Sequence, residues 1–364
     1  MFLLIIIWGH ENRIHAGIKF FIFTQAGGLG MLLSILLVYF SHGRNTGVYT
    51  FDFPELLKSS INPDVLVFIV GGFLLAFLVK LPVVMLHTWL PEAHTQAPTA
   101  GSIILAGLLL KTGAYGIIRF VLPLYHGLAL NPAPVLMTLG AIGILYGAKL
   151  AFAQTDIKRL IAYSSVSHMG FVLLGIFSFN EMALSGAVVQ MIAHGLSTGA
   201  LFMIAGSLQE RISSRSLDQM GGLWKQAPRM ASLALIFVLA SLGLPGFGNF
   251  IGEFLILAGA FKSEVLITAT ASLGFIASVI YGLRFFQRIF YGPPGNRSVS
   301  DFSFRETAAM ASLAVAILWL GIFPQAVISG AAFHNIFSAE GKSGVEKESP
   351  ASYQKIVIKT NKIW

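Results

Sequence analysis

The sequence contains no cysteine among its 364 residues. Disulfide bonds are therefore excluded, and an iron–sulfur cluster, which cysteine thiolates hold, is not expected. The histidines His10 and His15 are five residues apart rather than four, so they do not share a helix face in the manner of a zinc motif. We expect no metal site and no redox cofactor on this chain.

Charged residues are also scarce. Lys, Arg, Asp and Glu make up 11% of the chain, whereas a soluble globular domain has about 25%. Hydrophobic residues make up 55%, and the mean hydropathy is +0.76. Too few polar side chains remain to cover a core of this size, which excludes a soluble enzyme and a disordered chain. The composition predicts a protein embedded in a lipid bilayer.

Basic residues exceed acidic ones, 24 against 16, and the formal net charge is +8. In a membrane protein this excess follows from the Lys and Arg of cytoplasmic loops, so we expect no nucleic-acid partner. With alternate loops on opposite faces, one face, called the basic face below, receives Arg13, Lys19, Lys149, Lys158, Arg159, Arg211, Arg215, Lys225, Arg229, Arg284, Arg288, Arg297 and Arg305. The opposite face receives Arg44, Lys58, Arg119, Lys262 and the lysines of the C-terminal tail. The basic face is predicted to be cytoplasmic.

The apolar stretches predict an all-α polytopic membrane protein. Stretches of about 20 residues or more are long enough to span a bilayer as helices. Nine are found, at residues 17–41, 65–90, 98–123, 132–154, 156–179, 182–209, 230–261, 265–290 and 305–337. A β-barrel is disfavoured, because its strands would be about ten residues long and would alternate polar with apolar side chains. Glycines three or four residues apart, namely Gly140, Gly143 and Gly147, or Gly195 and Gly199, predict close approach between helices.

The first residues do not look like a signal peptide. Residues 1–8 are apolar but too short to span a membrane, no basic residue precedes them, and no small-residue cleavage site follows. We interpret residues 1–16 as the remnant of a helix that begins further upstream. At the other end, residues 338–364 form a polar tail.

Two of the predicted helices carry residues that interrupt a helix. Residues 65–90 contain Lys80-Leu81-Pro82, and residues 230–261 contain the glycine- and proline-rich segment 243–248. Proline removes a backbone donor and clashes with the preceding turn. Two interrupted helices in one membrane protein are a pointer to a transport site built on inverted repeats, although ordinary proline kinks are the alternative.

Three charged residues lie inside these helices. Glu253 and Lys111 each sit within an apolar run, and Lys80 lies at the first interruption. A charge at the centre of a membrane helix costs about 2.5–3.5 kcal/mol on insertion scales, so such residues are expected to face protein or internal water and to mark a pathway. A structural ion pair is the alternative. Buried lysine and glutamate can both exchange protons near neutral pH.

Histidines accompany these charges. His87, His94, His168 and His194 all lie in or near predicted spans. An imidazole can accept a proton on one nitrogen and donate it from the other, which suits a relay. His194 is the preferred relay residue. His87, His94 and His168 have either a relay role or a packing role.

Three long segments resemble the antiporter-like, proton-translocating subunits of complex I, the NADH-quinone oxidoreductase. They are residues 80–101, KLPVVMLHTWLPEAHTQAPTAG, residues 154–170, QTDIKRLIAYSSVSHMG, and residues 243–254, GLPGFGNFIGEF. The resemblance runs from about residue 1 to 337. Glu253 indicates one type within the family, since another type carries a lysine in that helix.

The resemblance implies a fold of fourteen helices with two inverted five-helix repeats, each holding one broken helix. Residues 132–290 would form the complete second repeat, residues 17–131 part of the first, and residues 291–337 the last membrane helix. Lys80 would be the broken-helix lysine, Lys111 the connecting lysine, His194 the intervening relay residue and Glu253 the exit-side group. The glutamate that pairs with Lys80 in the family would lie just upstream of Met1, so a truncated reading frame or a split subunit is expected.

The resulting hypothesis is a proton-translocating inner-membrane subunit of NADH-quinone oxidoreductase with no redox chemistry of its own. Its partners would be the lipid bilayer and the other membrane subunits, while other chains bind NADH and quinone. A subunit of a cation/proton antiporter or of a membrane-bound hydrogenase from the same superfamily is the alternative. A purely structural helical scaffold is the third reading.

Overall fold

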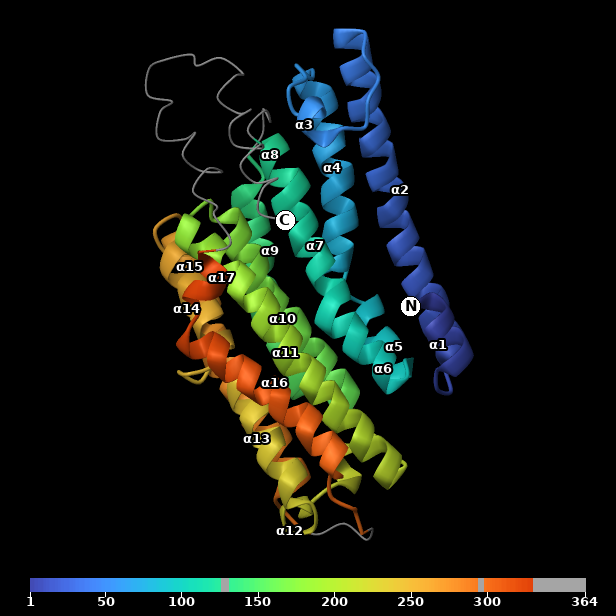
Figure 1. The fold of residues 1–364 in the computed structure, drawn as a ribbon, viewed down its shortest axis with the longest axis vertical. Coiled ribbons are helices and arrows are strands. Elements are labelled where there is room, and N and C mark those ends of the chain that lie inside the picture. The colour runs from blue at the N-terminus through green and yellow to red at the C-terminus, as the bar shows by residue number, and fades with distance from the viewer. Residues whose placement is uncertain (126–130, 294–297, 330–364) are drawn as a thin grey trace.

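The computed structural model describes residues 1–125, 131–293 and 298–329 (Figure 1). Within these ranges the chain is helical, and the only extended pairing is one isolated antiparallel bridge between Asp156 and Ser216. The polar tail predicted at 338–364 and the end of the predicted span 305–337 lie outside the described residues.

Eight helical segments are long and apolar enough to cross a membrane, which confirms a polytopic membrane protein. They are α2 (Arg13–Thr46), α4 (Pro63–Lys80), the segment Thr99–Leu124, α9 (Ala133–Phe152), α10 (Ile157–Phe177), α11 (Glu181–Ile212), α15 (Val265–Phe290) and α16 (Phe304–Ile322). Two shorter apolar helices, α13 (Pro228–Ser241) and α14 (Gly248–Ala260), cover the predicted span 230–261. Short connectors are α3 (Phe53–Leu56), η3 (Leu217–Gln219) and α12 (Leu223–Gln226).

The segment after residue 98 is one helix with two changes of pitch. It comprises α6 (Thr99–Ile104), η1 (Leu105–Leu109), α7 (Leu110–Gly116), η2 (Ile117–Val121) and α8 (Leu122–Tyr125), where η1 and η2 are π-helical. Short π-helical turns inside α-helices are frequent at functional sites. Their presence was not predicted from the sequence.

The first predicted helix interruption is confirmed. α4 ends at Lys80, and α5 (Trp89–Gln96) begins after a non-helical segment that contains Pro82. The indole Nε1 of Trp89 donates a hydrogen bond to the carbonyl oxygen of Val79 at 3.0 Å, so the buried ring ties the two half-helices together.

The second interruption is confirmed between α13 and α14. Gly243 and Gly246 adopt φ values of +74° and +103°, a region that favours glycine, and Pro245 lies between them. The last predicted span differs from the structure. α16 ends at Ile322 rather than continuing, because Pro324 cannot extend it, and the short helix α17 (Gln325–Ile328) follows.

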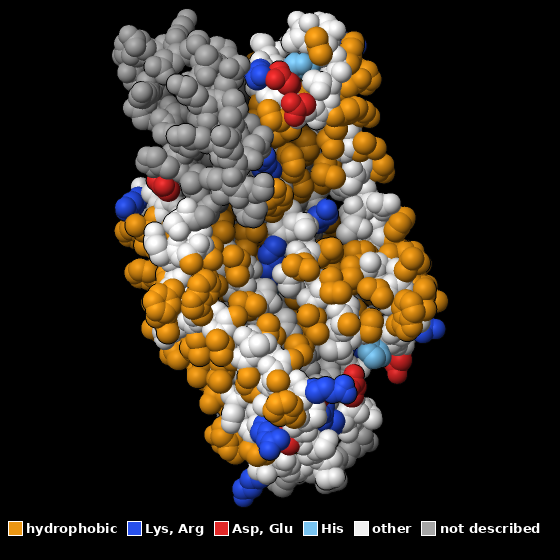
Figure 2. Space-filling model, in the orientation of Figure 1, with side chains coloured by type: hydrophobic (Ala, Val, Ile, Leu, Met, Phe, Trp, Pro, Cys, Tyr) orange, Lys and Arg blue, Asp and Glu red, His pale blue; other side chains and the backbone are white. Residues whose placement is uncertain are grey.

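α10 is the central helix of the bundle (Figure 1). Its apolar window is 94% buried, whereas that of α2, on the outside, is only 17% buried. Glycines of α9 allow the close packing that was predicted: a Cβ on Gly140 would lie 2.9 Å from the carbonyl oxygen of Gly170, and a Cβ on Gly147 would lie 2.6 Å from the Ser167 nitrogen. Apolar side chains also cover the sides of the molecule, as a lipid environment requires (Figure 2).

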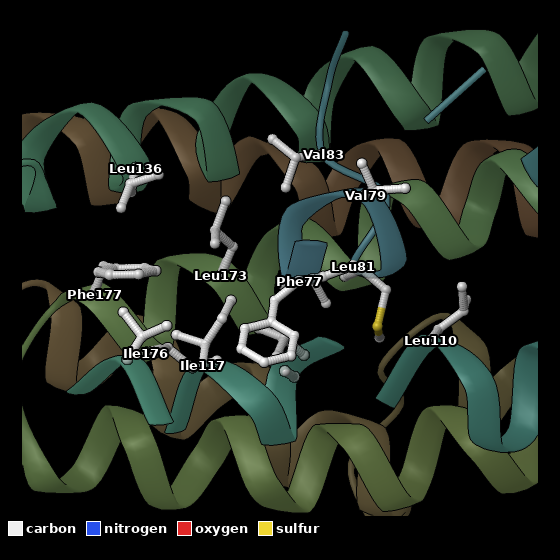
Figure 3. Close-up of a cluster of buried hydrophobic side chains, with 14 of the residues drawn as sticks. Phe77, Val79, Leu81, Val83, Leu110, Ile117, Leu136, Leu173, Ile176 and Phe177 are labelled. Atoms are coloured by element: carbon white, nitrogen blue, oxygen red, sulfur yellow. The ribbon is translucent and has the colours of Figure 1, made fainter. Parts of the chain in front are cut away.

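The first interruption is packed into the main core. Val83 lies near Leu173 of α10, and Leu81, Leu136 of α9 and Ile117 of η2 belong to the same cluster (Figure 3). Leu81, Pro82 and Val83 are buried, whereas Met85 is 81% exposed. The start of the interruption is therefore enclosed by protein, which is the setting where non-helical backbone is tolerated at membrane depth.

Candidate functional site

Lys111 and His194 form a direct contact inside the bundle. The Nζ atom of Lys111, on α7, lies 2.6 Å from Nδ1 of His194, on α11. Lys111 Nζ also donates a hydrogen bond to the carbonyl oxygen of Ala106 in η1. Lys111 is 9% exposed and His194 is fully buried. The predicted connecting lysine and the preferred relay histidine are therefore brought together.

Glycines make this contact possible. Gly195 follows His194 directly, and a Cβ there would lie 3.0 Å from the carbonyl oxygen of Gly107. The helix that carries Lys111 and α11 thus approach at backbone distance, which confirms the close approach predicted for Gly195. η1 lies just before Lys111, and its Ala106 carbonyl accepts the lysine side chain.

His168 and Glu253 form a second buried pair. Nδ1 of His168, on α10, lies 2.7 Å from Oε1 of Glu253, on α14, and each side chain is 1% exposed. Gln190 of α11 donates from Nε2 to the same oxygen at 2.7 Å. A carboxylate removed from water needs such partners, because an unpaired buried charge is strongly destabilising.

The two pairs lie end to end. The ring centres of His168 and His194 are 5.6 Å apart. Lys111, His194, His168 and Glu253 come from four different helices and form a row of groups that can gain or lose a proton. The row joins the segment Thr99–Leu124, which follows α5, to α14, which follows the second interruption.

Lys80 lies at the edge of this row. It is the last residue of α4 and is partly buried. A Cβ on Gly113 of α7 would lie 3.1 Å from Cβ of Lys80, so the two backbones are close two residues beyond Lys111. Within the described ranges, no hydrogen bond or ion pair of the Lys80 side chain is found.

His87 and His94 are buried, but they are not bonded to this row. His94 stacks on Phe202 of α11 with ring centres 4.3 Å apart, and neither of its nitrogens has a partner among the described residues. His87 lies edge-on to Tyr146 of α9 at 5.4 Å. Both rings therefore fill space between helices in this structure.

Four buried polar residues of this region were not predicted. Gln190, Ser241 and Tyr281 contact Glu253 or His168, and Lys158 is fully buried with Nζ donating to the carbonyl oxygen of Ala97 at 3.2 Å. Gln190 could have been predicted, because it precedes His194 by one helical turn on an apolar helix and therefore lies on the same face. Lys158 looked like a loop residue because it lies at the start of α10.

These features define a class of protein: a polytopic membrane subunit with two interrupted helices around a buried row of Lys, His and Glu. Residues 1–280 match the family described as NADH:quinone oxidoreductase/Mrp antiporter, transmembrane. The chain belongs to this family.

Its relatives include NADH-quinone oxidoreductase subunit M of Pseudomonas aeruginosa, 52% identical over 345 residues, covering 92% of this chain and 68% of the relative. Subunit M of Escherichia coli K12 is 49% identical over 337 residues, covering 90% and 66%. A chain of respiratory complex I from Thermus thermophilus with bound NADH has the same fold, with a TM-score of 0.84, 36% identity, and coverage of 93% and 71%. The chain spans about two thirds of the length of the curated relatives it matches.

Proposed function

We propose that this chain is a proton-translocating membrane subunit of an NADH-quinone oxidoreductase, and that Lys111, His194, His168 and Glu253 carry the proton. The observation that supports this most directly is the pair of buried contacts, Lys111 to His194 at 2.6 Å and His168 to Glu253 at 2.7 Å. A scaffold would gain little from four titratable groups in its core, because burying each charged form costs free energy.

The first pair can exchange a proton between its partners. A Lys111 ammonium donates to Nδ1 of a neutral His194, and transfer along that bond leaves a neutral amine and an imidazolium. One water molecule is enough to span the separation between the two imidazole rings. The imidazolium charge can then reach His168.

The second pair ends the row. When Glu253 is ionised, His168 donates its Nδ1 hydrogen to the carboxylate, and transfer along this bond leaves a neutral glutamic acid. Gln190 favours the ionised carboxylate by donating to it. Glu253 is thus a group on which a proton can wait before release, and we propose that the release is toward the face opposite the basic face.

Lys80 is proposed to be the first group of the pathway, because it lies at the interruption of α4 and close to the backbone beyond Lys111. His87 and His94 are proposed to be packing residues, since their rings contact Tyr146 and Phe202 and not the row.

The full architecture is proposed to contain nine membrane crossings, with α13 and α14 together forming one of them. Residues 132–290 would form a complete five-helix repeat, and residues 17–131 part of an inverted copy. The supporting observation is that each unit holds one helix interrupted by proline, α4 with α5 and α13 with α14. Inverted repeats with broken helices are a recurrent plan for ion pathways.

The setting follows from the family. We propose that the chain lies in the cell inner membrane with its basic face toward the cytoplasm, beside other membrane subunits. NADH and quinone would be bound by other subunits, and this chain would carry no redox cofactor. Its part would be to couple quinone reduction elsewhere in the complex to proton movement.

The test is Glu253→Gln and Lys111→Met in the assembled complex, with NADH-driven proton pumping as the readout. Glu253→Gln is expected to lower pumping by at least about tenfold, because the carboxylate that receives the proton is lost, and Lys111→Met is expected to lower it by about twofold, because a group that supplies the carboxylate is lost. Glu264→Gln, in the connection before α15, is the matched control and is expected to pump normally. Normal pumping by the assembled variants contradicts the proposal, and a sodium-dependent exchange that does not need NADH indicates an antiporter instead.

A further inference from the structure

The second nitrogen of His168 has partners of its own. Nε2 lies 3.2 Å from the hydroxyl of Ser241, at the end of α13, and 3.2 Å from the hydroxyl of Tyr281 on α15. Ser241 is 5% exposed and Tyr281 is 3% exposed. When Nδ1 of His168 carries the hydrogen that it donates to Glu253, Nε2 is bare, and both hydroxyls can donate to it.

A cavity lies on the far side of these hydroxyls. Ser241 and Tyr281 line it together with Ser164 of α10, and its volume of about 20 Å³ is enough for one water molecule. The remaining walls are apolar. Three hydroxyl-bearing side chains line the space, and of these Ser164 donates to the carbonyl oxygen of Ile161 and so offers only an acceptor to a water there.

The cavity lies between His168 and the basic face. Leu160 and Ser164, which line it, and His168 are spaced four residues apart, so they form one row along α10 that leads back to its first residue, Ile157. The cavity residues of α15 likewise lie near its last residue, Phe290. At these two helix ends Arg215 pairs with Asp156, the residue before α10, at 3.2 Å, and Arg288, in the last turn of α15, pairs with Asp218 at 3.7 Å. Arg215 and Arg288 belong to the basic face.

The neighbouring histidine is less well placed to supply His168. The ring centres of His194 and His168 are 5.6 Å apart, and both nitrogens of His168 are already engaged by Glu253, Ser241 and Tyr281. A proton arriving from His194 requires His168 to turn. A proton arriving through the hydroxyls reaches Nε2 along hydrogen bonds that are already in place.

We propose that Ser241, Tyr281 and the cavity form a second proton entry to Glu253 that starts at the basic face and bypasses Lys111. This inference rests on the proposed role of Glu253 as a proton carrier. The two hydroxyls are relay and positioning groups that act through His168.

The step balances without any other reactant. A hydroxyl gives its proton to Nε2 of His168 and regains one from water in the cavity, which is resupplied from bulk water. The N–H bond at Nδ1 breaks, and an O–H bond forms on Glu253. One proton has moved from bulk water to the carboxylate, which leaves a hydroxide in the bulk water at the basic face. The hydrogen of His168 is now on Nε2, and a turn of the imidazole ring points this N–H toward Glu253 for the next transfer.

The test uses Tyr281→Phe and Ser241→Ala in the assembled complex. NADH-driven pumping and the ratio of its rates in H₂O and D₂O are measured. Each variant is expected to pump about twofold more slowly, because the entry through Lys111 and His194 still supplies Glu253. The solvent isotope ratio is expected to rise, because proton delivery becomes the slow step. Tyr115→Phe, whose parent ring is 51% exposed on α7, is expected to behave like the parent. Ser241→Thr, which keeps the hydroxyl, is expected to recover the rate that Ser241→Ala loses.

The outcomes distinguish failure of the second entry from failure of the proposed proton-carrier role of Glu253. If Tyr281→Phe and Ser241→Ala keep the parent rates and isotope ratios while Glu253→Gln is inactive, the second entry is overturned. The proton relay through Glu253 is then still supported. Slower pumping with an unchanged isotope ratio assigns the hydroxyls to orientation alone and also overturns it. Normal pumping by Glu253→Gln removes the proposed function itself. If either variant fails to assemble, Ser164→Val, which fills the cavity from α10, carries the same expectation.

Discussion

A buried carboxylate keeps its charge only if nearby donors replace the water it has lost, and Glu253 has two such donors. His168 supplies one, and the amide of Gln190 supplies the other at 2.7 Å. Hydrogen bonds to charged groups contribute more than neutral ones, about 1.5–3 kcal/mol each. Gln190 therefore helps to decide how readily Glu253 holds and releases its proton.

Replacing Gln190 with Leu keeps the volume and removes the donor. Pumping is expected to fall by about tenfold, which corresponds to about 1.4 kcal/mol and lies near the low end for a bond to a charged group. The matched control is Gln154→Leu, because Gln154 donates from Nε2 to the Leu150 carbonyl outside the row. Equal rates in the two variants would argue against a role for Gln190.

His10 is a titratable residue in the turn between α1 (Phe2–Trp8) and α2, outside the membrane-spanning segments. Burial lowers its pKa below the ordinary value of 6.5, and the nearby positive charges of Lys158 and Arg215 lower it further. Its Nε2 lies 3.1 Å from Nε2 of Gln209, which donates to the neutral ring. Protonation removes that acceptor and places a third positive charge in the cluster.

The sign of the pH effect follows from this depressed pKa. The unfolded chain takes up the proton first, so the stability is greatest above the ordinary pKa and falls as the pH drops through it. Thermal denaturation of the purified complex between about pH 8 and pH 5.5 is expected to show a smaller acid destabilisation in His10→Asn than in the parent. His15→Asn, at a side chain that is 77% exposed, is expected to keep the parent profile. Identical profiles for both variants would exclude His10.

At the scale of elements, the interruption between α13 and α14 depends on backbone shapes that few residues adopt. Gly246 has φ of +103°, and a Cβ there would meet nothing within 4 Å, so conformation alone restricts this position. Gly71, in the middle of α4, also has open space around it but a helical backbone.

This pair gives a controlled test of the interruption. Gly246→Ala is expected to destabilise the protein by about 1–2 kcal/mol, because a side chain disfavours positive φ. Gly71→Ala is expected to be neutral or stabilising by about 0.5–1 kcal/mol, since alanine favours a helix more than glycine does. Apparent melting temperatures of the two purified variants distinguish the effects, and an equal shift in both would refute the conformational argument.

Elements were more predictable from the sequence than contacts between them. Pro82 and Pro245 act on their own backbone, so both interruptions could be located in advance. The partners of Glu253 depend on how α10, α11 and α15 are rotated, and near-uniform hydrophobicity gives little indication of that rotation. Tyr281 and Ser241 therefore looked like ordinary members of apolar helices, and His168 could not be distinguished from a packing residue. Pro324 is a helix-ending residue that was visible in the sequence, but the predicted span 305–337 continued past it.

At the scale of the whole molecule, the distribution of charge predicts an orientation. The lack of cysteine in this sequence makes the prediction easy to test, since any introduced thiol is unique. Lys225, in the short connecting helix α12, and Lys262, in the turn between α14 and α15, are both exposed lysines at opposite ends of the bundle. The excess of Lys and Arg places Lys225 on the cytoplasmic side.

The matched variants are Lys225→Cys and Lys262→Cys, labelled with a membrane-impermeant maleimide. In intact spheroplasts only the cysteine at position 262 is expected to react, and in inverted vesicles only the one at position 225. Each loop lies outside the apolar helices, so the thiol is accessible from one side without disturbing the core. The reverse pattern would place the basic face outside, and the cavity beside His168 would then open toward the side to which protons are delivered. The same labelling therefore decides whether Ser241 and Tyr281 lie on the entry side or the exit side of Glu253.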